Sequence, residues 1–177
     1  MRVKKLSGRL AAMASFVSAG ESVADIGADH GYLPIYLVRE GISPFAILTD
    51  VQEGPLEKTC ISVERTLGKN GFFDNEDPRM AGRLSLRLGD GLSVLDEAEI
   101  DVVVIAGMGG ETIISILSAD PEKTKSFGKY ILQPRTKVNE LKNWLINESW
   151  KIISETKADE KGRLCDIIVC TPPLDIT

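Results

Sequence analysis

The segment Val23-Ala-Asp-Ile-Gly-Ala-Asp-His-Gly-Tyr-Leu-Pro34 holds the features that decide the fold of this chain. An apolar strand runs into an acidic residue and a glycine-spaced turn, and a helix opened by Pro34 follows. An α/β sheet uses such a strand–turn–helix unit to present backbone N–H groups to a nucleotide-like ligand. The segment therefore predicts an α/β fold with a ligand site at the end of its first strand.

Strand and helix patterns alternate along the rest of the chain. Strands are expected at residues 22–26, 45–49, 84–88, 101–106, 129–132, 150–156 and 163–170. Apolar residues with helical spacing begin with Leu6, Leu10, Met13 and Val17 and recur at residues 32–40, 56–67, 112–117 and 138–145. Residues 72–83 are expected to form a loop. The last two strands are separated only by a polar turn at residues 159–162. This order predicts a mostly parallel, doubly wound, seven-stranded sheet with one antiparallel strand near the C-terminus.

Composition places the chain among ordinary globular proteins. Its 177 residues suggest a single domain over residues 1–177, with 43% hydrophobic and 27% charged residues. It has no apolar run of about 18 residues, so no membrane span is expected. Cys60, Cys165 and Cys170 are expected to be buried free thiols in a reducing cytoplasm, and with His30 as the lone histidine no metal site is expected.

Polar or glycine residues follow four of the expected strands. They are Asp25 with its glycine turn, Asp50, Gly89-Asp90-Gly91 and Gly107-Met-Gly-Gly110. Because ligands of doubly wound sheets bind at the carboxyl ends of the strands, these residues are candidates for one site. Asp50 could accept hydrogen bonds from ribose hydroxyls, and Asp90 from an adenine amino group. Each signal taken singly is equally compatible with a structural turn or a helix start.

Asp29 stands where a dinucleotide-binding fingerprint has its middle glycine. A carboxylate there would repel a pyrophosphate, so a dehydrogenase is disfavoured. An acidic turn suits a cofactor with a cationic end, and S-adenosylmethionine carries both a sulfonium and an ammonium group.

At these motifs the sequence resembles the class I methyltransferases, and more narrowly the bacterial TrmK family. The resemblance lies in DIGADHGYLP (25–34), GDGL (89–92), VIAGMGG (104–110) and ILQP (131–134), and extends from LSGRL at residue 6 to about Val169. Members of that family methylate N1 of adenine 22 in tRNA. The resemblance implies a Rossmann-like fold, S-adenosylmethionine as cofactor, tRNA as partner and a cytoplasmic location.

The resemblance also implies roles for individual residues. The cofactor would be bound by Asp25, Gly27, Gly31, Asp50, Val51, Gly89, Asp90, Gly91, Ala106, Gly107 and Met108. Asp29, His30 and Gln133 would face the target base. Asp29 could stabilise the positive charge of the product or bind the cofactor ammonium, and His30 could contact the base or hold the turn.

The chain departs from the family in three respects. Arg135 follows ILQP where relatives have asparagine, and the loop at residues 72–83 is longer. The family's C-terminal helical domain is expected to be absent, since the chain stops at Thr177.

The net charge of −5 argues against a uniformly nucleic-acid-coating surface. Two basic clusters could contact tRNA phosphates or be ordinary solvated faces: Arg2, Lys4, Lys5 and Arg9, then Arg135, Lys137 and Lys142. The alternative functions are methylation of a small molecule or a protein, and a non-catalytic binding module on the same fold.

Overall fold

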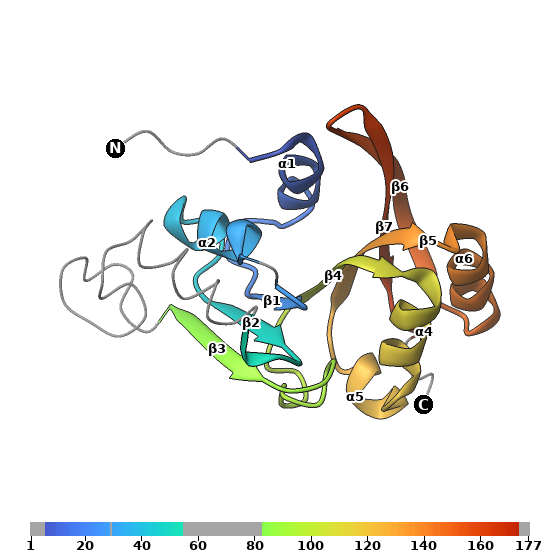
Figure 1. The fold of residues 1–177 in the computed structure, drawn as a ribbon. Helices are drawn as coiled ribbons and strands as arrows, with labels where there is room; N and C mark the ends of the chain where they lie inside the picture. Colours follow the sequence, from blue (N-terminus) through green and yellow to red (C-terminus); the bar gives the residue numbers. More distant parts are fainter. Residues whose placement is uncertain (1–5, 29, 55–82, 174–177) are drawn as a thin grey trace.

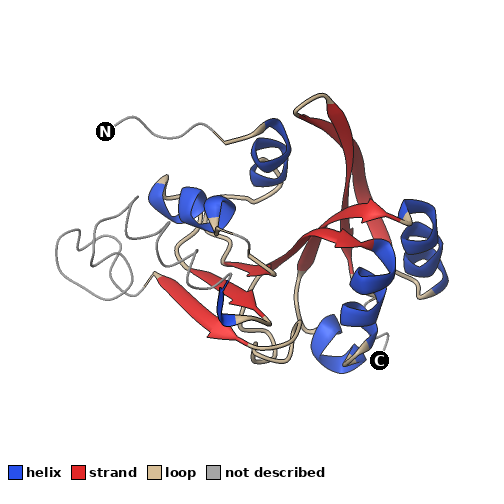
Figure 2. Ribbon diagram, viewed as in Figure 1, coloured by secondary structure: helices blue, strands red, loops and turns tan. Residues whose placement is uncertain are grey.

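A single sheet with the strand order β3-β2-β1-β4-β5-β7-β6 organises the structure, a computed structural model that describes residues 6–28, 30–54 and 83–173. The strands are β1 (Val23–Ile26), β2 (Ala46–Asp50), β3 (Leu84–Leu88), β4 (Val102–Gly109), β5 (Lys129–Thr136), β6 (Lys151–Glu160) and β7 (Arg163–Thr171). The described helices are α1 (Gly8–Ala14), α2 (Tyr32–Arg39), α4 (Gly110–Ser118), α5 (Pro121–Lys125) and α6 (Val138–Asn147). They cover both faces of the sheet (Figure 1, Figure 2).

Strands β1 to β5 pair in parallel, and β7 is antiparallel to both of its neighbours, β5 and β6. The predicted sheet, mostly parallel with one antiparallel strand near the C-terminus, is confirmed. Parallel pairing brings the carboxyl ends of β1, β2, β3 and β4 to one edge, where ligands of such sheets bind.

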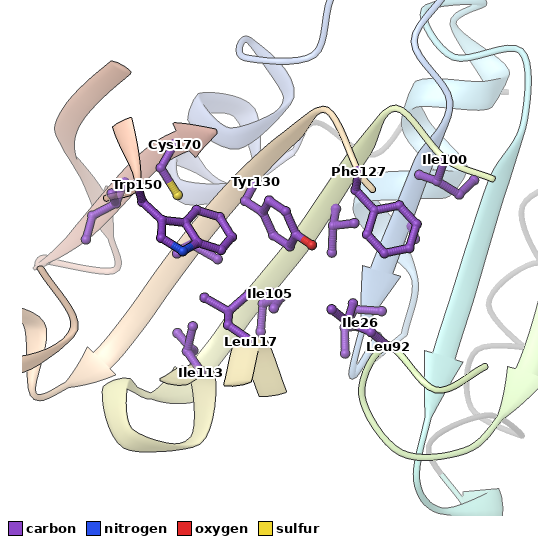
Figure 3. Close-up of a cluster of buried hydrophobic side chains, with 14 of the residues drawn as sticks. Ile26, Leu92, Ile100, Ile105, Ile113, Leu117, Phe127, Tyr130, Trp150 and Cys170 are labelled. Carbon is purple, nitrogen blue, oxygen red and sulfur yellow. The ribbon is translucent and has the colours of Figure 1, made fainter. Parts of the chain in front are cut away.

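The core lies in two layers because side chains alternate along each strand. On β4, Val103 and Ile105 pack toward α4 and α6, whereas Val102 and Val104 pack toward α1 and α2. All four side chains are fully buried, and each burial of this kind stabilises the fold by roughly 1.5–3 kcal/mol. Figure 3 shows the first layer, which includes several aromatic rings. A continuous apolar run therefore forms β4 because both of its faces are covered.

Three elements differ from the sequence-based expectation. Strands β4 and β5 continue three and four residues past the predicted ends, because β4 carries a bulge at Gly107, beyond which Met108 and Gly109 stay paired to Pro134 and Thr136 of β5. Strand β6 runs to Glu160, so the turn to β7 is the two-residue Lys161-Gly162. Both turn residues have positive φ, 54° and 81°, which matches the right-handed twist of a hairpin.

Helix α5 was missed from the sequence although its start is well marked. Asp120 accepts a hydrogen bond from the Lys123 N–H, and Pro121 occupies the first turn. The predicted helix at residues 56–67, most of the predicted loop at residues 72–83, and Cys60 lie outside the described residues.

Of the two described cysteines, Cys170 is buried and Cys165 is partly exposed, and both are free thiols. Burial raises the pKa of Cys170 to about 12, so its thiol stays protonated at neutral pH. None of the helices in the described ranges has the length and apolar character needed to cross a membrane. The same ranges hold no cluster of three or more metal-ligating side chains.

Candidate active site

A cavity of about 1200 Å³ opens at the carboxyl edge of the sheet. Its walls come from the residues that follow β1, β2 and β3, from the end of β4 and from α4. Helices α1 and α2 and the β6–β7 hairpin add the remaining walls. Figure 1 shows α1 and the hairpin beside one another, well away from α4. The cavity is therefore bounded both by the sheet and by elements outside the strand ends.

The turn after β1 is held by the neighbouring strand. The N–H groups of Gly27 and Ala28 both donate to the Thr49 carbonyl oxygen, each at 2.9 Å. Gly27 has a φ of +73°, and a Cβ there would lie 2.4 Å from the Met108 Cε atom. Glycine is favoured at this position because other residues rarely adopt this positive φ, and a side chain would also displace the Met108 methyl group.

Asp25 lies at the floor of the cavity near the end of β1 and is only 9% exposed. No hydrogen bond to its carboxylate is found among the described residues. Burial raises the pKa of Asp25 to about 7, and the positive charge of Arg9 partly offsets the rise. The site therefore holds a carboxyl group that is half ionised near neutral pH and is suited to a cationic ligand.

The ends of β2 and β3 lie side by side. The Gly89 N–H donates to the Asp50 carbonyl oxygen at 2.9 Å, which aligns the two loops. The Asp50 carboxylate accepts one hydrogen bond through Oδ1 from the Gln52 N–H at 3.0 Å. Asp90 is exposed and lines the cavity. Two carboxylates are thus presented at this end, each with oxygen atoms available to a polyhydroxyl or amino ligand.

The end of β4 carries a bulge at Gly107. Ala106 pairs with Gln133 and Met108 with Pro134, which leaves Gly107 as the extra residue, with a φ of +75°. Its N–H donates to Gln133 Oε1 at 3.1 Å. Because of this bulge, residues 106–108 form part of the cavity wall.

Arg9 connects α1 to this bulge. Its Nη1 atom donates to Gln133 Oε1 at 3.1 Å, and its Nε atom donates to Glu160 Oε2 at 2.7 Å. Ser7 also donates to Glu160 Oε2, at 3.2 Å. Arg9 was grouped from the sequence with residues that could contact phosphate, and the structure gives it these intramolecular partners.

Aromatic and basic side chains from the turn after β1, from α2, from β5 and from the hairpin also line the cavity. The rings of His30 and Tyr32 stack with centroids 5.4 Å apart and planes 17° apart. Tyr36, Arg39, Arg135 and Lys161 line the same cavity. The acidic residues Asp25, Asp50 and Asp90 come from the ends of β1, β2 and β3, and Glu160 of the hairpin adds a further carboxylate, which is paired with Arg9.

The structure brings together most of the residues predicted for the site. Those lining the cavity are Asp25, Gly27, His30, Asp50, Val51, Gly89, Asp90, Gly91, Ala106, Gly107 and Met108. Gly31 does not line it and instead precedes α2 as its N-cap, with a φ of 60°. Gln133 is 2% exposed and hydrogen-bonded within the protein, while Asp29 lies outside the described residues.

Sequence reasoning missed several lining residues, chiefly Ser7, Tyr36, Arg39, Thr112, Ile116, Glu160 and Lys161. The last two belong to a hairpin whose place in the sheet is set by pairing that the sequence does not display. Of the two downstream basic-cluster lysines, Lys137 pairs with Glu140 at 3.0 Å and Lys142 pairs with Glu155. Neither lines the cavity, whereas Arg135 does.

A family model described as a methyltransferase domain matches residues 6–168. The chain is 35% identical over 169 residues to the tRNA (adenine(22)-N(1))-methyltransferase of Bacillus subtilis, covering 96% of this chain and 66% of that protein. It spans 57% to 66% of the length of the curated relatives it matches.

Solved structures agree with this match. The B. subtilis TrmK crystal structure has a TM-score of 0.81 and 35% identity, covering 96% of this chain and 67% of that one. A Streptococcus pneumoniae protein, Sp1610, in complex with S-adenosyl-L-methionine, has a TM-score of 0.83 and 33% identity, covering 98% and 76%.

The fold and the cavity at its carboxyl edge are those of a methyltransferase domain, and the chain belongs to that family. Within it, the chain belongs to the TrmK family.

Proposed function

We propose that this chain binds S-adenosylmethionine and transfers its methyl group to N1 of an adenine in tRNA, at position 22 as in the B. subtilis relative. The observation that carries the proposal is the lining of the cavity. Three carboxylates that follow β1, β2 and β3 line it, together with aromatic and basic side chains from α2, β5 and the hairpin. The carboxylates suit a cationic cofactor, and the aromatic and basic side chains suit a purine with its phosphates.

The residues present fit this cofactor. Asp25 is buried without a hydrogen-bond partner among the described residues, so a ligand ammonium would satisfy it. The buried Thr49 hydroxyl at the cavity wall also has no partner within the described part of the chain. Asp50 would accept hydrogen bonds from the ribose and Asp90 from the adenine amino group, with Gly27 leaving room for the methionine part.

The remaining cavity suits a base taken out of its stack. Tyr32 is 36% exposed, and its ring is stacked with His30 at the cavity wall. Enzymes that modify bases hold the extruded base by stacking and by contacts to its edge. Arg39, Arg135 and Lys161 line the same cavity and would contact flanking phosphates.

The reaction requires little proton transfer by the side chains of the protein. When bound, the cofactor supplies an electrophilic methyl group on a sulfonium. Adenine N1 has an in-plane lone pair, so a new N–C bond forms as the S–C bond breaks, and no base need act first. The ring gains the positive charge that sulfur loses. The task of the residues is therefore to hold the two reactants in line and exclude water.

The Gly107 bulge contributes to that alignment. The backbone of residues 106–108 borders the cavity and is fixed by the hydrogen bond from the Gly107 N–H to Gln133. Asp29 is retained in this proposal as a carboxylate for the developing charge, on the basis of the sequence resemblance.

Methylation of unmodified tRNA transcripts tests the proposal. The protein is incubated with methyl-labelled cofactor and a transcript carrying adenine at position 22, and the modified base is identified by nuclease digestion and mass spectrometry. The expected product is 1-methyladenine at that position. A transcript with guanine at position 22 is the matched control and should receive no label. Label on neither transcript, or on both equally, would contradict the assigned target.

A further inference from the structure

Helix α1 precedes the alternating strands and helices of the sheet, yet one of its side chains contacts two strands at the site and, through one of them, a third. The Arg9 guanidinium bonds Gln133 Oε1 on β5 and Glu160 Oε2 on β6, at 3.1 and 2.7 Å. Gln133 Oε1 in turn accepts the N–H of the Gly107 bulge on β4, at 3.1 Å. The guanidinium is half-buried, with 21% of the side chain exposed.

We propose that Arg9 is a positioning residue of the methyl-transfer site, whose guanidinium fixes the Gln133 amide and through it the bulge at Gly107. This proposal rests on the proposed function. It assigns Arg9 a role inside the site, and phosphate contact with tRNA is the competing role.

The hydrogen-bond pattern fixes which way the Gln133 amide points. Its oxygen receives two donors, from Gly107 and Arg9, while its nitrogen donates to the Pro134 carbonyl oxygen at 3.0 Å. Reversal of the amide would bring an N–H group against two other donors. Arg9 is therefore a second donor that stabilises this orientation of a side chain that is 2% exposed and that holds the cavity backbone.

The planar guanidinium is needed for this arrangement. Its Nε and Nη1 atoms point along different directions of a rigid fork, so they reach β6 and β5 together. A lysine at position 9 would keep the charge but not the two directed bonds.

The charge of Arg9 has a separate effect, on Asp25. Arg9 lowers the Asp25 pKa, opposing the rise that burial causes. The other ionisable side chains that line the cavity are His30 after β1, Tyr32, Tyr36 and Arg39 on α2, Asp50 after β2, Asp90 after β3, Arg135 on β5, Glu160 on β6 and Lys161 in the hairpin turn. Among the described residues, Arg9 is the charged group that shifts the Asp25 pKa.

Lys129 provides a matched control for loss of an ion pair. Its Nζ atom bonds Glu21 Oε2 at 2.7 Å and the Phe16 carbonyl oxygen at 2.8 Å. Its side chain is 17% exposed, close to the value for Arg9. This pair also ties the N-terminal segment to β5, but at the opposite end of the strand, and none of its three residues lines the cavity.

The test compares Arg9→Met, Arg9→Lys and Lys129→Met with the parent chain. Binding of S-adenosylhomocysteine is measured by calorimetry from pH 5.5 to 8.5, and kcat and KM are measured with tRNA at several salt concentrations. Arg9→Met should raise the pH midpoint of ligand binding and lower kcat about tenfold or more. Arg9→Lys should restore the midpoint but not kcat. Lys129→Met should lower the thermal midpoint while leaving both readouts as in the parent.

Three results would overturn the proposal. Equal changes in Arg9→Met and Lys129→Met would make Arg9 a purely structural contact. A flattened salt dependence of tRNA binding, with an unchanged pH profile and kcat, would make Arg9 a phosphate contact. A kcat for Arg9→Lys equal to that of the parent chain would show that the two directed guanidinium hydrogen bonds are not needed. If Arg9→Met does not fold, the Arg9→Lys result alone tests the positioning role of Arg9. Absence of methylation by the parent chain itself would instead contradict the proposed function, and the ligand-binding profile would still test Arg9.

Discussion

Asp25 is a cavity residue whose ionisation depends strongly on the fold around it. Its pKa moves from 3.8 to about 7 on burial. The folded chain therefore binds a proton that the unfolded chain releases between these values. The contribution of Asp25 to stability is fully present below pH 3.8, falls as pH rises, and is lost above about pH 7. The total loss is on the order of 4 kcal/mol.

Asp25→Asn should accordingly raise the free energy of unfolding of the unliganded protein at pH 8, by about 2–4 kcal/mol, because the neutral amide avoids a buried charge. At pH 4 the change should be small, since the parent carboxyl group is then largely protonated in the fold. Urea unfolding at the two pH values checks this. A gain of the same size at pH 4 would show that ionisation is not its cause.

Ligand binding should follow the opposite trend with pH. The ammonium group of the ligand favours ionised Asp25, so affinity for S-adenosylhomocysteine should rise with pH up to about 7 and then level off. Below that pH, binding should release a proton. Calorimetry in two buffers with different ionisation enthalpies measures the release. Asp25→Asn should abolish it, and release that persists in this variant would assign the proton to another group.

A further prediction concerns the contribution of Asp50 to ligand affinity. Asp50→Asn should weaken binding of S-adenosylhomocysteine by about 1–3 kcal/mol, since it removes charge-assisted hydrogen bonds to the ribose. Glu122→Gln, an equivalent change on the exposed face of α5, is the control. If the Asp50 variant binds S-adenosylhomocysteine with the same affinity as the parent chain, the ribose does not contact Asp50 and binds elsewhere in the cavity.

The candidate residues at strand ends were predictable because each follows its own strand directly, and parallel pairing collects strand ends at one edge. Arg9 could not be assigned its contacts in this way. It meets Glu160 across 151 positions of sequence, through packing of a helix on a hairpin. The sequence pattern of a basic residue on a helix is the same whether its side chain contacts a phosphate or a buried amide, so the sequence does not distinguish the two roles.

At the scale of elements, α1 and the β6–β7 hairpin form one wall of the cavity through close backbone contact. A Cβ at Gly8 would lie 2.4 Å from the Asp159 carbonyl oxygen. Alanine normally stabilises a helix by about 1 kcal/mol relative to glycine. Here the clash should reverse that sign, so that Gly8→Ala lowers the thermal midpoint and weakens ligand binding. Gly54→Ala, where nothing lies within 4 Å, is the control. A stabilised Gly8→Ala variant would mean that α1 shifts without consequence.

The ends of β4 and β5 were the hardest strand boundaries to predict, because residues with low strand propensity pair with one another there. Pro134 lacks an N–H, and a glycine-rich segment lacks strand propensity, so β4 and β5 each read as ending early. In the structure the bulge places these residues opposite one another, and pairing outweighs the local signal. The predicted type and order of strands survived because each strand interior is strongly apolar.

For the whole molecule, the net charge of −5 and the basic side chains that line the cavity predict a local tRNA contact. Affinity for tRNA should fall as salt rises, while affinity for S-adenosylhomocysteine should change little. Replacing Arg135 or Lys161 with glutamine should each reduce the logarithmic salt slope by about 1. Lys123→Gln, on α5 and outside the cavity lining, should leave the slope unchanged. Equal slopes in all variants would place the phosphate contacts on another surface.

The order of the last strands also has a consequence for synthesis on the ribosome. Strand β6 emerges before β7, yet β7 is the strand that joins β6 to the sheet. A nascent chain that ends after β6 holds that strand with no neighbour to pair with among β1 to β5. Helix α1 is translated before these strands, and Glu160 reaches Arg9 only once β7 has joined β6 to the sheet. Translation therefore delivers the acidic strand ends before the hairpin wall beside Arg9 can form.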